Sequence, residues 1–486
     1  MKLLWIGTPK SQLLKRVTAD HFVITHDLRF FEYHASTSLL TPLDLPVNRE
    51  SIDGISNLDL LSRLPYLIDI WSRWDICSQL SLEKLLQRSH CIVSSLTIAL
   101  ASLKIDKVFA CYATPHHLWN NLVELACELE QIPVLHLYPF LELDISIPIF
   151  GNNHNISSFP EAAPDHEWSR YTSFKVASYV DRIKQIAFSP ESKRCFQHRF
   201  RSPIAIGYYR YLRILKSYLS SSIKRSIPYR PLSYAGLTDN PLSTLLALHH
   251  IQDTQDRAIS FYLRNVDTFL NLTPQTDSVT FLLIGHVQPE ASTSPMGVVF
   301  YSQIKVAQYI RSKCANCRIF YREHPGSFYS ILPGGHETLV GISRSIFYYK
   351  ELLSLGVQFM PVGGNVISLL KRYPHLIPVT ITGSVALEAP VSVASPCIYF
   401  GEPYWQGFPG SIHYKNVNWL NIAEQFKAIR SSPDILTHAS IQWLEERASL
   451  NCVPNTMGYG ISSKEILFPK NFYDLFYSRL NNCLSG

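Results

Sequence analysis

Three stretches in the second half of the chain carry side chains that could bind an anion or move a proton. The first runs from Gly285 to Gly297 and holds His286, Gln288 and Glu290, with three hydroxyl side chains and two prolines. It is far longer than the roughly 4–6 residues of most connections. A functional loop is our interpretation, because such loops carry binding sites. The alternative is a structured loop whose side chains only cap the next helix.

The second stretch is a turn around His324. This histidine comes directly after the apolar run Arg318 to Arg322, and Pro325 stiffens the turn. An imidazole N–H can donate to a phosphate oxygen, and the Arg322 guanidinium can add positive charge. The alternative is a histidine that only bonds to backbone carbonyls. We interpret the turn as part of a phosphate-binding site.

The third stretch places Gly383 and Ser384 at the start of a predicted short helix. Glycine allows a close backbone approach, and the N–H groups and hydroxyl at a helix start form an anion site. Glu388, one turn further on, could accept hydrogen bonds from ribose hydroxyls. The alternative is a plain helix cap. In the loop Phe400 to Gly410, rich in glycine, proline and aromatic residues, Glu402 and Trp405 are the residues we expect to touch a ligand.

Together these stretches predict a site for a nucleotide mono- or diphosphate. The sequence contains no GxxxxGK[ST] motif and no GxGxxG motif. We therefore expect neither a P-loop nor a dinucleotide cofactor, and we assign no cofactor.

Each stretch follows a predicted strand. From Ser278 onward, apolar runs of strand length alternate with stretches of helical spacing. The predicted strands are Val279 to Gly285, Arg318 to Arg322, Val357 to Met360, Leu376 to Ile381 and Cys397 to Phe400. The predicted helices are Gly297 to Lys313, Ser343 to Leu355, Asn365 to Arg372 and Val385 to Pro390. This alternation indicates a parallel sheet, which binds ligands at the carboxyl ends of its strands.

The first half predicts a second such unit. After a first strand at Leu3 to Ile6 come the strand Val108 to Tyr112, the helix Leu118 to Glu130 and the strand Ile132 to Leu137, with His116 in the turn before the helix. The pattern predicts an α/β fold with two Rossmann-like, doubly wound parallel-sheet domains that face a cleft. The expected boundaries are an acceptor domain at 1–160, a basic helical connector at 161–275, a nucleotide domain at 276–440 and C-terminal helices at 441–486 that pack back on the first domain. Within the connector we expect a helix from Ala258 to Leu272.

The positive charge of the chain is concentrated in one segment. The formal net charge is +6, yet residues 182–230 hold 12 Lys or Arg and one acid, with several aromatic residues between them. Basic residues interleaved with aromatics suit an anionic membrane surface. A solvated basic face is an equal alternative, and we do not expect a nucleic-acid partner.

The sequence favours a cytoplasmic protein, with peripheral attachment to the inner membrane through the basic segment. The longest weakly polar run, Cys91 to Leu103, is shorter than the roughly 20 residues of a membrane span, and the N-terminus lacks the apolar stretch of a signal peptide. The ten cysteines are expected to be reduced thiols. Cys314 and Cys317 form a lone CxxC without a second pair of ligands, so we expect no metal site.

As a set, these motifs resemble the bacterial capsular-polysaccharide biosynthesis family, which includes the Kdo transferases of capsule assembly. The resemblance rests on His286 to Glu290, Glu323 to Pro325, Thr382 to Ser384 with Glu388, and Phe400 to Glu402 with Gly407 to Gly410, and it covers about residues 278–412. It implies a GT-B glycosyltransferase with the donor in the C-terminal domain and the acceptor in the N-terminal one. The sequence departs from the family pattern at Gly363-Gly364 and at Pro390, where we expect the helix after Ser384 to be interrupted.

By this resemblance, His324 and Ser384 would bind the phosphate of a CMP-linked, Kdo-like sugar, and Glu388 would lie near the ribose or base. Stabilising the departing phosphate needs preorganised donors. With no DxD-type motif near these residues, we expect metal-independent transfer to a saccharide or glycolipid acceptor. Candidates for the base are Glu290, His286 and His116.

Three other functions stay open on sequence grounds. A CDP-polyol phosphotransferase of the teichoic-acid type would share the fold and the use of cytidine. A nucleotide-sugar epimerase would need no membrane surface, which the basic segment disfavours. An inactive scaffold of a capsule assembly complex would tolerate loss of His324.

Overall fold

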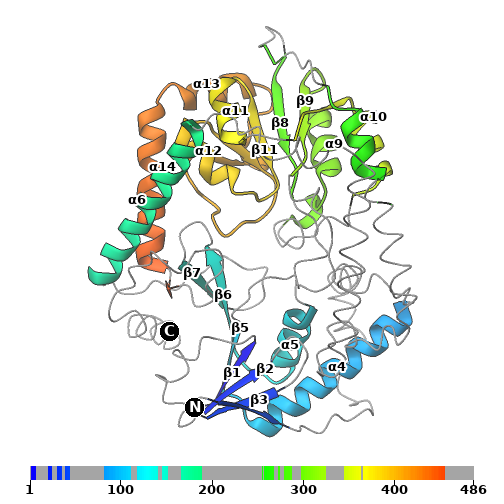
Figure 1. The fold of residues 1–486 in the computed structure, drawn as a ribbon, viewed down its shortest axis with the longest axis vertical. Helices are drawn as coiled ribbons and strands as arrows, with labels where there is room; N and C mark the ends of the chain where they lie inside the picture. Colours follow the sequence, from blue (N-terminus) through cyan, green and yellow to red (C-terminus); the bar gives the residue numbers. More distant parts are fainter. Residues whose placement is uncertain are drawn as a thin grey trace, which may run out of the picture. The chain divides into compact units, whose positions relative to one another are not determined.

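The structure is a computed structural model (Figure 1). It describes residues 2–6, 20–24, 30–34, 39–43, 82–110, 118–140, 145–150, 166–188, 254, 257–267, 272–273, 278–286, 297–324, 344–362, 365–451 and 453–454. The chain divides into two compact units. Unit 1 comprises 1–179, 230–239 and 444–486, and unit 2 comprises 180–229 and 240–443.

Unit 1 contains an eight-stranded sheet with the order β14-β7-β6-β5-β1-β2-β3-β4. Its strands are β1 (Lys2–Ile6), β2 (Asp20–Ile24), β3 (Phe30–His34), β4 (Leu39–Leu43), β5 (Lys107–Ala110), β6 (Val134–Phe140), β7 (Ile145–Phe150) and β14 (Val453–Pro454). The four central strands β2, β1, β5 and β6 pair in parallel. Both edges are antiparallel, which the sequence pattern did not predict.

Three long helices accompany this sheet. Helix α4 (Leu82–Leu103) leads into β5, and α5 (Leu118–Leu129) connects β5 to β6, which gives the predicted βαβ unit. Helix α6 (His166–Phe188) packs on the end of α14 (Pro433–Asn451), where the Trp168 indole Nε1 donates to the Ala448 carbonyl over 3.0 Å. Among the helices that the structure describes, none is both long and apolar enough to cross a membrane.

Unit 2 contains a six-stranded sheet with the order β10-β9-β8-β11-β12-β13, and every pair is parallel. Its strands are β8 (Thr280–Ile284), β9 (Arg318–Arg322), β10 (Val357–Phe359), β11 (Ile377–Thr380), β12 (Cys397–Tyr399) and β13 (Ser411–His413). Its helices are α9 (Gln303–Lys313), α10 (Ile346–Ser354), α11 (Val366–Arg372), α12 (Val385–Val393) and α13 (Ile422–Arg430), with short 3₁₀ turns at Val298–Phe300 and Tyr414–Asn416. The predicted α/β architecture with two sheets is confirmed.

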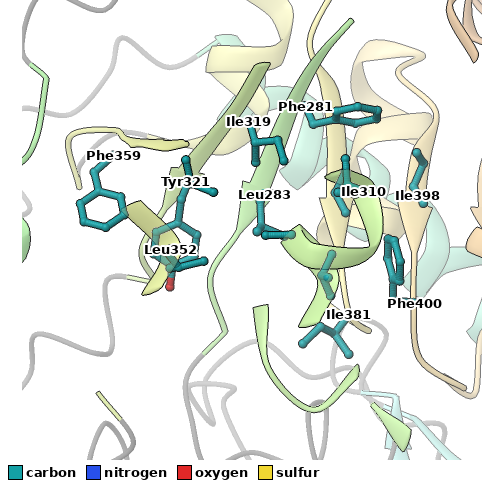
Figure 2. Close-up of a cluster of buried hydrophobic side chains, with 14 of the residues drawn as sticks. Phe281, Leu283, Ile310, Ile319, Tyr321, Leu352, Phe359, Ile381, Ile398 and Phe400 are labelled. Carbon is teal, nitrogen blue, oxygen red and sulfur yellow. The ribbon is translucent and has the colours of Figure 1, made fainter. Parts of the chain in front are cut away.

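The core of unit 2 is built from these strands and the helices on them. Figure 2 shows Leu283 in the middle of the cluster, with Tyr321 and Phe359 on one side and Ile398 and Phe400 on the other. Strands β8, β9, β11 and β12 are almost wholly buried, so they carry nearly continuous apolar runs that made them recognisable in the sequence. The half-buried strand β13 was not predicted.

Two predicted helices differ from the structure. The helix expected at Ala258 to Leu272 ends earlier, at Arg264, and Val266 then forms a parallel bridge to Phe359. The helix after Ser384 was expected to stop at Pro390, but α12 continues through it to Val393. Proline lacks the N–H that would bond to the carbonyl of Ala386. The Ser411 hydroxyl on β13 donates to that carbonyl instead, so the carbonyl keeps a hydrogen-bond partner although the helix contains a proline.

Candidate functional site

The candidate site follows from the strand order of the second sheet. From β8 the chain proceeds to β9 and β10 on one side, and then to β11, β12 and β13 on the other. The order therefore reverses between β8 and β11. In open parallel sheets ligands bind at the carboxyl ends of the strands beside such a reversal. His286, His324 and Ser384 all follow strands at this edge.

His286 joins the two strands that flank the reversal. His286 follows β8 in the chain and is 4% exposed. Its Nε2 accepts from the Ile381 backbone N–H over 3.1 Å and lies 2.8 Å from the Thr380 hydroxyl, which in turn accepts from the Gly383 N–H over 2.9 Å. Since Nε2 is an acceptor, the proton of the neutral ring lies on Nδ1. The ring is thereby held between the two strand ends.

This burial has a consequence for pH. Burial, together with the charges of His324 and Arg344, lowers the pKa of His286 to about 3. Between pH 6.5 and 3 the unfolded chain binds a proton that the folded chain refuses, so stability falls as the pH falls through this window. The full difference is on the order of 4–5 kcal/mol. We expect His286→Gln to flatten the dependence of unfolding free energy on pH in this range.

The measurement is urea denaturation at a series of pH values, with His438→Gln, an exposed histidine of α14, as the matched control. The control should keep the wild-type slope. An unchanged slope in His286→Gln would show that this ring is not the group that titrates.

The carboxyl end of β9 carries a buried ion pair. The Arg344 Nε donates to Glu323 Oε2 over 2.7 Å and its Nη2 to Oε1 over 3.0 Å, and both side chains are at most 1% exposed. The hydroxyls of Tyr321 and Tyr349 donate to Glu323 Oε2 over 2.7 and 2.8 Å. Such a buried pair is tolerated only when its remaining hydrogen-bonding positions are filled, and here the tyrosines fill them.

The pair is ionised in the folded protein. Burial alone would raise the pKa of the Glu323 carboxyl, but the charge of Arg344 and the hydrogen bonds outweigh it and hold the pKa below its ordinary value. Burial likewise works against the Arg344 cation, yet Glu323 raises the pKa of Arg344 well above its ordinary value. Arg322, at the end of β9, is also buried, at 5% exposed, so two arginines lie at this edge of the sheet.

His324 lies next to this pair and is half-buried. Its backbone N–H donates to Glu323 Oε1 over 2.8 Å, which fixes the direction in which the turn leaves β9. Burial lowers the pKa of the imidazole, and the nearby arginines add to the effect. The ring is thus neutral near pH 7 and has an N–H to donate.

Helix α12 begins at the end of β11 with an uncommitted hydroxyl. Ser384 is half-buried, has helical backbone angles and makes no capping hydrogen bond with its side chain. The amides of Ala386, Leu387 and Glu388 bond back to Gly383 and Ser384, whereas those of Ser384 and Val385 donate to no backbone carbonyl within the described chain. The hydroxyl and these two amides form the donor set that suits a phosphate at a helix N-terminus.

Gly383 is required by packing at this point. A Cβ there would lie 2.7 Å from Thr380 Oγ1 and 3.1 Å from His286 Cε1. The glycine therefore lets the chain pass close over the His286 ring. It gives the turn before Ser384 its path.

Of the other predicted site residues, the structure describes some and leaves others outside the described residues. Glu388 is half-buried on the first turn of α12, and Glu402 is exposed after β12. Trp405 is 1% exposed and packs on Tyr399, so it is a core residue and not a ligand contact, contrary to our expectation. The predicted residues His116, Gln288, Glu290 and Pro325 lie outside the described residues, as do Gly363 and Gly364.

Sequence reasoning missed Arg344. A signal was present, since the predicted helix Ser343 to Leu355 placed this cation in its first turn, where the helix dipole disfavours positive charge. A cation at this position needs an acidic partner. Glu323, in the turn that follows β9, is that partner.

In the described part of the chain no cluster of His, Cys, Asp and Glu could hold a metal ion. Cys314 and Cys317 are free thiols. Of the basic segment 182–230, the structure describes residues 182–188, where Arg182 and Lys184 are exposed on α6.

No protein-family model matches the chain, and no curated protein matches it. Several solved structures resemble it, and two of them are described here. The Thermosulfurimonas dismutans KpsC, a beta Kdo 2,7 transferase, is 18% identical with a TM-score of 0.22, and the likeness covers 35% of this chain and 48% of that one. The UDP-GlcNAc 2-epimerase from Methanocaldococcus jannaschii is 13% identical with a TM-score of 0.22, over 90% of this chain and all of that one. The chain thus matches about half the length of the transferase, and at these TM-scores neither likeness identifies an activity.

Proposed function

We propose that the protein is a glycosyltransferase of the GT-B type. In this proposal it moves a sugar from a nucleotide-activated donor, CMP-linked and Kdo-like, to a lipid-linked or saccharide acceptor of surface-polysaccharide synthesis. The observation that carries the proposal is the placement of His324 and Ser384 on either side of β8, beside the reversal of strand order.

The geometry suits a single phosphate. The strands before His324 and Ser384 are two positions apart in the sheet, or about 10 Å. Side chains that reach inward from both could therefore contact one phosphate group. The neutral His324 imidazole would donate one N–H, Ser384 its hydroxyl, and the start of α12 its amides to the negative charge of the leaving phosphate.

The acceptor must be positioned and deprotonated in the same reaction. Among the three candidate bases, His286 has its Nε2 committed to Ile381 and a pKa of about 3. These properties suit a residue that positions the site better than one that accepts a proton near pH 7. Glu290 and His116 therefore remain the proposed bases, with Gln288 and Glu402 as further donor contacts and Glu388 at the ribose.

The basic segment 182–230 gives the proposal a membrane component. Arg182 and Lys184, exposed on α6, begin a series of 12 basic residues. Such a series would hold the enzyme at an anionic leaflet, where a lipid-linked acceptor is found.

Calorimetric titration with CMP, CDP, UDP and GDP tests the donor assignment. We expect CMP to bind most tightly. Preference for CDP would point to the polyol phosphotransferase, and preference for UDP would point to a UDP-sugar transferase or the epimerase. Absence of binding by all four nucleotides would contradict the enzyme proposal and favour the scaffold.

A further inference from the structure

We propose that Arg344 is the positioning residue of this site, because it ties the turn that carries His324 to the turn that carries Ser384. The inference rests on the proposed function for its ligand, and on the geometry alone for the positioning itself. None of the hydrogen bonds of the Arg344 side chain described below goes directly to His324 or to Ser384. It acts through Glu323 and His286.

The first connection leads to His324. Arg344 holds both oxygens of Glu323, at 2.7 and 3.0 Å. One of those oxygens, Oε1, accepts the backbone N–H of His324 over 2.8 Å. The orientation of the carboxylate therefore sets the position of the His324 backbone, and the arginine sets the orientation of the carboxylate.

The second connection leads to Ser384. The Nη2 of Arg344 also donates to the carbonyl of His286 over 2.8 Å. The ring of the same histidine bonds to Thr380 and Ile381, and the Thr380 hydroxyl accepts from Gly383, which precedes Ser384. A continuous series of hydrogen bonds thus runs from one phosphate-binding turn to the other, across three neighbouring strands.

Only the guanidinium shape can serve both connections. Its planar fork has five N–H donors, and Arg344 uses Nε and Nη2 on Glu323 and Nη2 again on His286. Its Cζ also lies over the Tyr348 ring, 4.5 Å from the ring centroid. A lysine ammonium keeps the charge but is a single point that cannot reproduce this geometry. Arg344→Lys therefore separates position from charge.

Arg311 provides a matched control. It also bonds to three acceptors on two segments, the carbonyls of the adjacent Leu355 and Gly356 and that of Cys317, at 2.6–2.9 Å. These lie at the end of α10 and beside the start of β9, at the opposite edge of the same sheet. Arg311→Lys should affect stability without affecting the proposed site.

The first test is calorimetric titration with CMP. Arg344→Lys should raise the Kd by roughly tenfold or more at unchanged stoichiometry, since small misplacements of binding groups are costly. Arg311→Lys should keep the wild-type Kd. A purely structural role would lower the stoichiometry, as protein is lost to unfolding, and leave the Kd as it is. That result would overturn the proposal.

Two further measurements keep the proposal testable if Arg344→Lys folds poorly or if no nucleotide binds. Thr380→Val, of nearly equal shape, removes one hydroxyl from the same series and should shift the Kd in the same direction. Without any ligand, ¹⁵N-histidine NMR should show changed His286 and His324 signals in Arg344→Lys, and unchanged ones in Arg311→Lys. If the signals change but the protein binds no nucleotide, Arg344 still positions the two turns, and the proposed function is wrong. If the signals do not change, the positioning role of Arg344 is wrong.

Discussion

Replacement of His324 by alanine is expected to lower the rate of sugar transfer by about 10²–10³-fold. Loss of one preorganised donor to a charge that develops in the transition state typically has an effect of this size. His324 is half-buried, its ring is neutral near pH 7, and its backbone is fixed by Glu323. The substitution would therefore remove a donor whose position the fold has fixed. The measurement is the steady-state rate with a CMP-linked sugar donor.

His375→Ala is the matched control for this experiment. His375 precedes β11, at the opposite edge of the same sheet, and its loss should leave the rate within a few-fold of the wild type. If His324→Ala also retained the wild-type rate and CMP affinity, the phosphate would not bind at this edge.

Replacement of Glu323 by glutamine is expected to lower the free energy of unfolding of unit 2 by about 3–5 kcal/mol. The substitution leaves the Arg344 cation buried without a counter-charge, and it replaces one of the two acceptor oxygens by an NH2 group, so that either the two tyrosine hydroxyls or the His324 N–H lose their acceptor. This is a large share of the 5–15 kcal/mol typical of a folded domain. Urea denaturation followed by far-UV circular dichroism measures it.

The double variant Glu323→Leu with Arg344→Met separates charge from position. Removal of both charges together should recover part of the stability lost in Glu323→Gln, because no buried charge then lacks its partner. The same protein should bind CMP poorly, since the backbone of His324 has lost its acceptor. Additive losses of stability in the single and double variants would contradict the role of this pair.

The second sheet could be predicted from the sequence for a specific reason. Strands β8, β9, β11 and β12 are buried on both faces, so Phe281 to Leu283 or Cys397 to Tyr399 appear as short apolar runs between turn residues, and the polar residues that follow mark the ligand edge. The sequence pattern alone therefore places His324 and Ser384 at one edge of the sheet.

The edges of the first sheet and the Arg344 network could not be predicted in this way. Strand β4 contains Pro42, and β14 has only two residues, so neither has a strand-like pattern, and both depend on pairing with a neighbour. The partners of Arg344 lie 21 and 58 residues away. Local patterns carry no information on such distant pairs. The continuation of α12 through Pro390 depends in the same way on Ser411, which is 21 positions further along the chain.

The hydrogen bond from Ser411 to the Ala386 carbonyl makes one order of substitution at positions 390 and 411 more favourable than the other. With Pro390 present, loss of the Ser411 hydroxyl leaves the Ala386 carbonyl buried without a donor. With an alanine at 390, the helix supplies its own N–H and the hydroxyl becomes dispensable. Evolution can therefore replace Pro390 first and Ser411 second, while the reverse order passes through a less stable intermediate. The effect of a change at 411 depends on residue 390, so the two positions are epistatic and constrain the mutational paths open to the helix beneath the proposed phosphate site.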